Sequence, residues 1–136
     1  MSNASIISVD DICARGIVRD SDVKALRRMV YDKNGLAAAD IEGLLRINRG
    51  TRMQDPAWAP FFVEAATDFV VNELPPQGYV TGENANWLMQ RIGPAGRVDN
   101  AAELEVLLTV LDRARWVPES LVSFALRQVK LAVIGA

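Results

Sequence analysis

The stretch 55–72 is apolar on almost every side of a helix, and it restricts the fold more than any other part of the chain. Asp55 can accept hydrogen bonds from the free N–H groups of a first turn, and Pro56 falls where a missing N–H costs little. Three of the few polar residues recur every four positions and share one narrow stripe: Glu64, Asp68 and Asn72. A helix that is apolar on its other sides is a buried one. We therefore predict a central helix over 56–72.

Apolar residues also recur at helical spacing in six other segments, which are bounded by capping residues, glycines or prolines. Four of the predicted helices cover about residues 9–15, 21–31, 83–92 and 118–134. Of the other two, one carries Ile41, Leu44, Leu45 and Ile47, and one carries Leu104, Leu107, Leu108 and Leu111. The N-cap is Asp20 or Ser21 for the second of them, and Asp99 or Asn100 for the fifth. With the central helix this gives about seven helices. The sequence thus predicts a single all-α domain over 1–136.

The two halves of the chain repeat each other. A shift of 62 residues places Gly16 on Gly78, Pro56 on Pro118 and further core positions on one another, including Leu26 on Leu88, Phe62 on Phe124 and Val71 on Val133. The register slips by about one residue between Tyr31 and Asp55. We interpret this as an internal duplication, with three-helix units over 16–72 and 78–134 related by a pseudo-two-fold axis and with both final helices, 56–72 and 118–134, at the centre. Chance alignment of apolar helices is the alternative.

The segment 1–15 precedes the first unit as a lead-in helix. Its residues 9–12 match residues 71–74, which form the end of the central helix. The lead-in helix therefore resembles the tail of a preceding unit. We expect the chain to be a two-unit piece of a longer array.

The absence of histidine excludes more functions than any other feature of the composition. With no histidine and one cysteine, the chain lacks the commonest general base, every nucleophile–histidine pair and the usual zinc ligands. The net charge of −2, with acids and bases interspersed, argues against a nucleic-acid partner. No leader and no apolar run of about 20 residues is visible, so we expect no membrane span and a cytoplasmic location.

Short glycine-plus-apolar pieces, such as 16–18 and 78–80, indicate EF-hand-like extended turns that pair beside each other. A calcium loop needs acids at its first and twelfth positions. With Gly35 at the sixth position, Val30 and Ile41 fall on those places. We therefore expect no cofactor and no functional calcium loop. A degenerate metal site is the alternative, with the ligands Asp32, Asn34 and Asp40.

Several other side chains have both a structural and a functional interpretation. Glu64 and Asp68 lie one turn apart and could form a catalytic pair, but such a stripe more often faces solvent or meets basic neighbours. The acids before Cys13 disfavour a reactive thiolate. A basic face on the first two helices is interrupted by acids and indicates a mixed surface. The tryptophans are expected first as core anchors and second as a partner surface: Trp58, Trp87 and Trp116.

Two tandem helical units, each with a glycine-plus-apolar turn before its helices, resemble the TerB-like fold of bacterial proteins associated with tellurite resistance. The pattern Asp55-Pro56-x-Trp58-x-x-Phe61-Phe62-Val63 is also similar to that of uncharacterised bacterial helical repeat proteins. The resemblance implies an all-α domain linked to stress response, with metal ions at acidic loops. This chain lacks dense acidic loops, and the resemblance assigns no functional residue.

These observations favour a non-enzymatic interaction or scaffold module. We expect a protein partner or self-association. The alternative is a TerB-like stress-response protein with a metal ion at Asp32, Asn34 and Asp40. An enzyme with a carboxylate pair at Glu64 and Asp68 ranks third.

Overall fold

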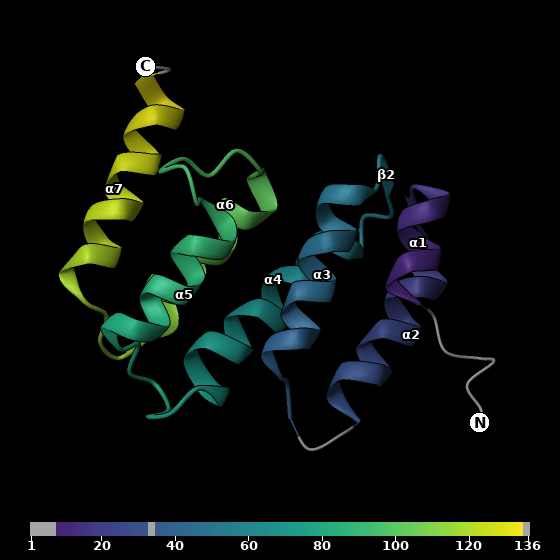
Figure 1. Ribbon diagram of the computed structural model, residues 1–136, viewed down its shortest axis with the longest axis horizontal. Helices are drawn as coiled ribbons and strands as arrows, with labels where there is room; N and C mark the ends of the chain where they lie inside the picture. Colours follow the sequence, from purple (N-terminus) through teal and green to yellow (C-terminus); the bar gives the residue numbers. More distant parts are fainter. Residues whose placement is uncertain (1–7, 33–34, 135–136) are drawn as a thin grey trace. The chain divides into compact units, whose positions relative to one another are not determined.

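The computed structural model describes residues 8–32 and 35–134. Within these ranges the chain is mostly helical, with two short strands, which confirms the predicted all-α fold (Figure 1). The helices are α1 (Val9–Arg15), α2 (Asp20–Tyr31), α3 (Ala38–Gly50), α4 (Trp58–Thr67), the π-helix η2 (Asp68–Glu73), α5 (Gly82–Ile92), α6 (Ala101–Arg113) and α7 (Glu119–Ile134). No helix in the described ranges has the length and apolar character needed to cross a membrane.

The chain divides into two compact units, Met1–Ala65 and Ala66–Ala136. The division falls inside α4, seven residues before the end predicted for the first repeat at residue 72. The tail of α4 and all of η2 therefore belong to the second unit. Each unit consequently begins with a lead-in helical segment, which is α1 in the first and η2 in the second.

Two short strands organise the first unit. β1 (Ile17–Val18) and β2 (Met53–Gln54) pair in the parallel sense, with Ile17 opposite Met53. The turn into β1 requires Gly16, whose φ of 73° lies in the left-handed region that side chains disfavour. The Gly16 carbonyl accepts a hydrogen bond from the Arg52 N–H at 2.9 Å. Because β1 precedes α2 and β2 precedes α4, this pairing fixes the starts of two helices beside each other.

Two glycines on α3 let α1 approach closely. A methyl group at Gly43 would lie 3.2 Å from Val9 Cγ2, and one at Gly50 would lie 3.1 Å from Cys13 Sγ. Both distances are shorter than ordinary van der Waals contact, so side chains here would push α1 outward. The fully buried Ile12 is the main core residue of α1.

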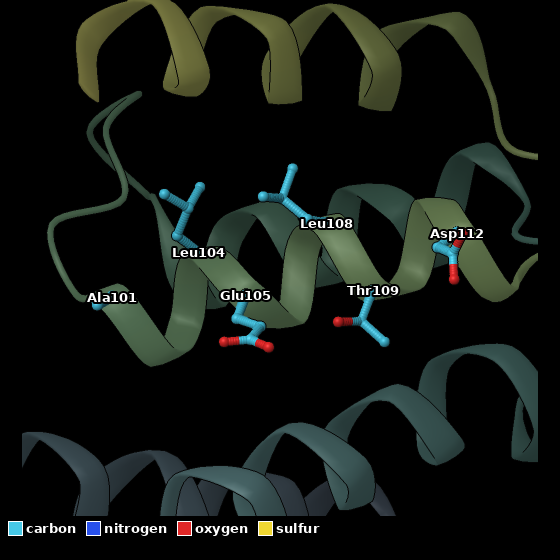
Figure 2. Close-up of a pocket in the computed structure, with 6 residues that line it drawn as sticks. All are labelled: Ala101, Leu104, Glu105, Leu108, Thr109 and Asp112. Atoms are coloured by element: carbon cyan, nitrogen blue, oxygen red, sulfur yellow. The ribbon is translucent and has the colours of Figure 1, made fainter. Parts of the chain in front are cut away.

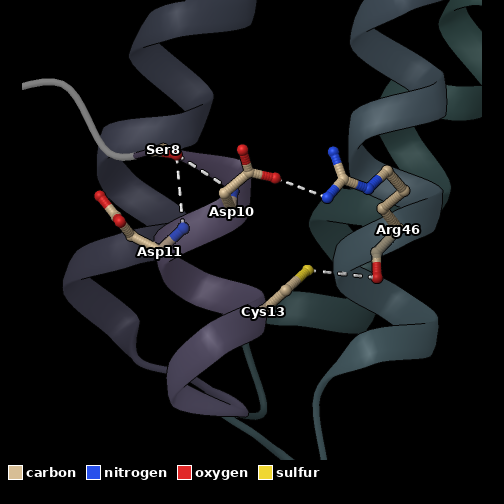
Figure 3. A network of polar contacts seen from close by, with 5 residues as sticks. All are labelled: Ser8, Asp10, Asp11, Cys13 and Arg46. Carbon is tan, nitrogen blue, oxygen red and sulfur yellow. Dashed lines mark hydrogen bonds and ion pairs between the residues drawn. The ribbon is translucent and has the colours of Figure 1, made fainter.

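Polar contacts fix the orientation of α1 (Figure 3). The Ser8 hydroxyl accepts hydrogen bonds from the N–H groups of Asp10 and Asp11, which makes Ser8 the N-cap of α1. The Asp10 carboxylate pairs with the Arg46 guanidinium of α3 at 2.6 Å. This hydrogen bond and the charge of Asp10 raise the pKa of Arg46 above its usual value. The Cys13 thiol lies 3.6 Å from the Arg46 carbonyl oxygen.

Aromatic rings and one buried amide attach α4 to the first unit. Trp58, Phe61 and Phe62 are fully buried. The Trp58 ring stacks on Phe62 with a centroid separation of 5.7 Å and meets Phe61 edge-on at 5.9 Å. The indole N–H donates to Asn48 Oδ1 of α3 at 2.9 Å. The apolar residues that recur at helical spacing in α2 and α3 are likewise buried: Val23, Leu26, Val30, Ile41, Leu44, Leu45 and Ile47.

The central helix has the predicted cap but a different interior. Asp55 Oδ1 accepts from the Ala57 N–H at 2.9 Å, and regular helix begins at Trp58. At Asp68 the helix widens into η2, and the Leu74 N–H reaches back to the Phe69 carbonyl at 3.0 Å. This five-residue hydrogen-bond spacing was not visible in the apolar pattern, because η2 spans only six residues and its wider period does not show over so short a stretch.

The second unit repeats this element order with shorter extended pieces. η2 packs on α6, and α7 packs on both α5 and α6. Tyr79 lies opposite Trp116 in a parallel bridge, where the Val80 N–H donates to the Trp116 carbonyl at 2.9 Å. Gly78 precedes the bridge with a φ of 86° and accepts from the Arg115 N–H at 2.7 Å.

The two turns share more than their order. The Arg52 side chain lies over Gly16, and the Arg115 side chain lies over Gly78. In both pairs the arginine N–H also donates to the glycine carbonyl. The internal duplication itself stays a prediction. The pseudo-two-fold axis and the assignment of both units to one domain stay predictions.

Two local predictions are wrong. The residue before α2 is Arg19, whose N–H donates to the buried Asp22 carboxylate, so neither Asp20 nor Ser21 is the cap. The extended turn at 16–18 was expected to pair with another such turn, but it pairs with β2 within its own unit and in the parallel sense.

Candidate functional site

Helix α7 has two apolar sides, and only one of them is covered. Its inner side is buried and consists of Leu121, Phe124, Ala125 and Gln128. On the other side, Val122, Leu126, Val129 and Val133 are 37%, 65%, 37% and 79% exposed. Their spacing of four, three and four residues places them in one line along the helix. We call this line the α7 stripe.

The side of α7 opposite the stripe is fixed by contacts within its unit. The buried Gln128 amide accepts from the Val98 N–H at 2.9 Å and donates to the Gly96 carbonyl at 3.0 Å. The Phe124 ring tip reaches Gly93, where a methyl group would lie only 2.8 Å away. α7 therefore presents the stripe from a fixed orientation within its unit.

The prediction that residues 118–134 form a central helix is wrong for this side of α7. The apolar pattern was recognised, but it does not say which apolar positions another element covers. Phe124 is buried, as predicted, whereas Val133 is exposed. In the first half of the sequence alignment, Val71 corresponds to Val133 and is only 3% exposed. The same position of the proposed repeat is thus covered at its first occurrence and open at its second.

Helix α6 carries a hollow of about 400 Å³ with an apolar and an acidic edge. Figure 2 shows Leu104 and Leu108 pointing toward α7, whereas Glu105, Thr109 and Asp112 point away from it. Leu108 is 40% exposed. Because one helix face lines it, the hollow does not enclose a ligand and favours contact with another surface over binding of a small molecule.

The tryptophans have different environments. Trp58 is a core anchor, as predicted. Trp87 contacts Phe69, with ring centroids 5.3 Å apart, and carries the Arg91 guanidinium on its face. Trp116 is 53% exposed, so the core interpretation is wrong for this residue and the partner-surface interpretation fits it better. Its neighbour Tyr79 is exposed as well, which gives the second unit a second apolar patch.

A second hollow, of about 360 Å³, lies between α2 and α4. Arg27 pairs with Glu64 at 3.0 Å and lies over the Phe61 ring, 5.1 Å from its centroid. Asp68, the other member of the proposed catalytic pair, accepts a hydrogen bond from the Asn72 side chain. Each carboxylate therefore has its own partner, which agrees with the interpretation of Glu64 as the partner of a basic neighbour. The remaining lining residues add one cation, one acid and one phenol: Arg28, Asp32 and Tyr31.

The structure describes two of the three alternative metal ligands, Asp32 and Asp40. Asp40 accepts a hydrogen bond from the Ala37 N–H at 2.8 Å and so helps to start α3. Asp32 is the C-cap residue of α2, and Asn34 lies outside the described residues. Within 8–32 and 35–134 no group of three acids, cysteines or histidines is arranged to hold a metal ion.

The basic residues of α2 and α3 are largely paired with acids. Lys24 contacts Asp20 at 3.2 Å, in addition to the pairs of Arg27 and Arg46 already described. Alternating signs on one face agree with the predicted mixed surface.

No protein-family model, no curated protein and no solved structure matches the chain. The class of protein is therefore defined by its own structure. It is an all-α protein of two compact units whose last helix carries an exposed apolar stripe.

Proposed function

We propose that this chain is a non-enzymatic interaction module that binds a protein partner through the α7 stripe. The observation that carries the proposal is a line of four exposed aliphatic side chains on a helix whose other side is well packed. Contiguous exposed apolar patches of roughly 300 Å² or more often mark interaction sites on soluble proteins. Regular spacing along a helix favours a helical or grooved partner surface.

The size of the stripe favours reversible binding. Its four side chains expose on the order of 300 Å², whose burial would supply about 7 kcal/mol before the costs of association. Those costs are of similar size, about 4–15 kcal/mol. A partner therefore needs further contacts, and exposed apolar features of the same unit that can supply them include the α6 hollow and Trp116.

Two alternatives lack a comparable observation. A carboxylate enzyme has no support from Glu64, because that side chain is paired with Arg27. The TerB-like stress protein with a metal ion remains an alternative proposal, supported by the resemblance of the two-unit order. The cytoplasmic location also stays a proposal, supported by the single cysteine, because proteins of reducing compartments rarely contain disulfides. The absence of a nucleic-acid partner is a proposal supported by the mixed charge.

Site-specific photo-crosslinking tests the proposed function. The photoreactive benzoylphenylalanine replaces Leu126 in one variant and the exposed Ser123, on the polar flank of α7, in a matched control. We expect crosslinks to a defined protein from position 126 in cells that produce the chain, none from position 123, and loss of the 126 product when Val133→Glu is added. Equal labelling from both positions, or no product from 126, would contradict the proposal.

A further inference from the structure

We infer that the α7 stripe pairs with the α7 stripe of a second copy of this chain, with the two helices antiparallel about a two-fold axis. This inference rests on the proposed function of the α7 stripe and names its partner. It follows from the spacing of the stripe, from two charges beside it that complement each other when one helix is reversed, and from the apolar area that the stripe exposes.

The α7 stripe has the spacing of a coiled-coil seam. Its steps of four, three and four residues are those of the a and d positions of a heptad. Side chains at such positions insert between those of a facing helix that has the same spacing. Each member of the stripe is aliphatic and at least 37% exposed. The stripe therefore suits another helix with an aliphatic line, and α7 of a second copy is such a helix.

Two exposed charges lie beside the stripe, one toward each end of it. Glu119 comes three residues before Val122, and Lys130 comes four residues after Leu126. The two charges are eleven residues apart, which is just over three helical turns, so both lie on the same flank of α7. Neither forms an ion pair with another residue in the parts of the chain that the structure describes. Both are therefore available to a partner.

An antiparallel pair of α7 helices brings these opposite charges together. A two-fold axis level with Phe124 places Val122 of one copy opposite Leu126 of the other. Glu119 then differs in level from Lys130 of the second copy by one residue, which is ~1.5 Å along the helix. Because a two-fold contact makes the same flank of both helices meet, each copy supplies one carboxylate and one ammonium group to two ion pairs.

The order of the charges selects this orientation. A two-fold contact uses the same patch on both subunits, so the patch has to be complementary to itself. With an acid toward the start of the stripe and a base toward its end, α7 is complementary to its own reverse. In a parallel pair Glu119 would instead lie level with Glu119 of the other copy, and Lys130 level with Lys130. The charges therefore favour the antiparallel pair.

The exposed area determines how stable such a dimer is. Two stripes of on the order of 300 Å² each bury roughly 600 Å² of apolar surface together. Stable protein interfaces bury at least about 1,200 Å². Ion pairs at the surface add little to the stability of an interface. The dimer is therefore weak and reversible, and its population depends on the protein concentration.

The first test uses the full chain and sedimentation velocity over a series of increasing concentrations. We expect the mass of wild type to rise reversibly from the 14.9 kDa of one chain toward twice that value and to stop there, because a two-fold contact closes. Leu126→Asp should stay monomeric. Its fold should be kept, since the side chain is 65% exposed, and circular dichroism checks this. Wild type that stays monomeric, or that grows beyond a dimer, overturns the inference.

Reversal of single charges tests the antiparallel register. Glu119→Lys and Lys130→Glu each replace both ion pairs of the dimer with like-charge contacts, so each should weaken association about tenfold or more. The matched control is Arg127→Glu, which makes the same change of charge as Lys130→Glu at an exposed position farther from the stripe. This control should associate like wild type. Equal effects of Arg127→Glu and Lys130→Glu would overturn the register.

A mixture of the two weakened variants gives the sharpest result. Glu119→Lys has two bases beside its stripe, and Lys130→Glu has two acids, so an antiparallel dimer of one copy of each has both ion pairs with their signs exchanged. We expect this mixed dimer to form as readily as the wild-type dimer, and native mass spectrometry resolves it when one variant is isotope-labelled. A mixture that associates no better than its components overturns the inference.

The crosslinking experiment separates this inference from the proposed function. A product of position 126 that consists of two copies of the chain supports both. A product with a different protein, together with wild type that stays monomeric, overturns the pairing of two α7 helices and leaves the proposed function standing. A monomeric chain that gives no product from position 126 overturns both.

Discussion

Truncation of Phe62 tests whether α4 organises the first unit. In the Phe62→Ala variant the ring is removed from a position that is fully buried. The ring that stacks on it, Trp58, loses its partner at 5.7 Å but keeps its hydrogen bond to Asn48. We therefore expect a cavity beside Trp58 rather than loss of the whole aromatic cluster.

The expected cost is large relative to the stability of a chain of this size. Truncation of a buried phenylalanine to alanine typically costs ~3–5 kcal/mol. The lost ring stacking is part of that value, at about 0.5–1.5 kcal/mol. Single domains have a free energy of unfolding of only about 5–15 kcal/mol, so the variant should be strongly destabilised. With an m-value of about 1–3 kcal/mol/M in urea, the midpoint should fall by roughly 2 M.

Urea unfolding followed by tryptophan fluorescence and by circular dichroism measures this change. The first matched control is Asp68→Ala, whose free energy of unfolding should stay within about ±0.5 kcal/mol of wild type, as is usual for surface changes. The second is Glu64→Ala, which loses the exposed ion pair with Arg27 and should lower the free energy of unfolding by up to about 1 kcal/mol. Phe124→Ala should resemble Phe62→Ala, because that ring is also buried. If Phe62→Ala is as mild as Asp68→Ala, α4 is peripheral to the stability of the chain and the reasoning is refuted.

Three further predictions concern a buried hydrogen bond, a glycine turn and metal binding. Asn48→Leu should cost about 1–3 kcal/mol in urea unfolding, because the buried Trp58 N–H loses its acceptor; a change below 0.5 kcal/mol would speak against that role. Gly16→Ala should lower stability by about 1 kcal/mol or more, since its φ is 73°, whereas Gly82→Ala, with open space around it, should be neutral or slightly stabilising. Calorimetric titration with Ca²⁺, Mg²⁺ and Zn²⁺ should give no saturable heat, and a signal that Asp40→Asn weakens would instead favour the metal-binding alternative.

Helix boundaries were largely visible in the sequence because local chemistry sets them. The bounds predicted for the first helix, about 9–15, are those of α1, which begins after the Ser8 cap and ends before Gly16. Asn100 caps α6 and was one of two candidates. At α2 the same reasoning failed, because the side chain that accepts the N–H lies at Asp22, inside the helix. Several acids near a helix start can accept the same N–H, and the fold selects one.

Apolar periodicity by itself determined the core of the first unit and the fold class. It located the buried residues of α2, α3 and α4, since burial of one helix face requires the same spacing wherever that helix packs. It also made α4 and α7 look alike. Only the tertiary structure decided that Val71 is covered and Val133 is open, because coverage depends on whether another element lies against that side of the helix, and the spacing of residues within the helix carries no record of its neighbours.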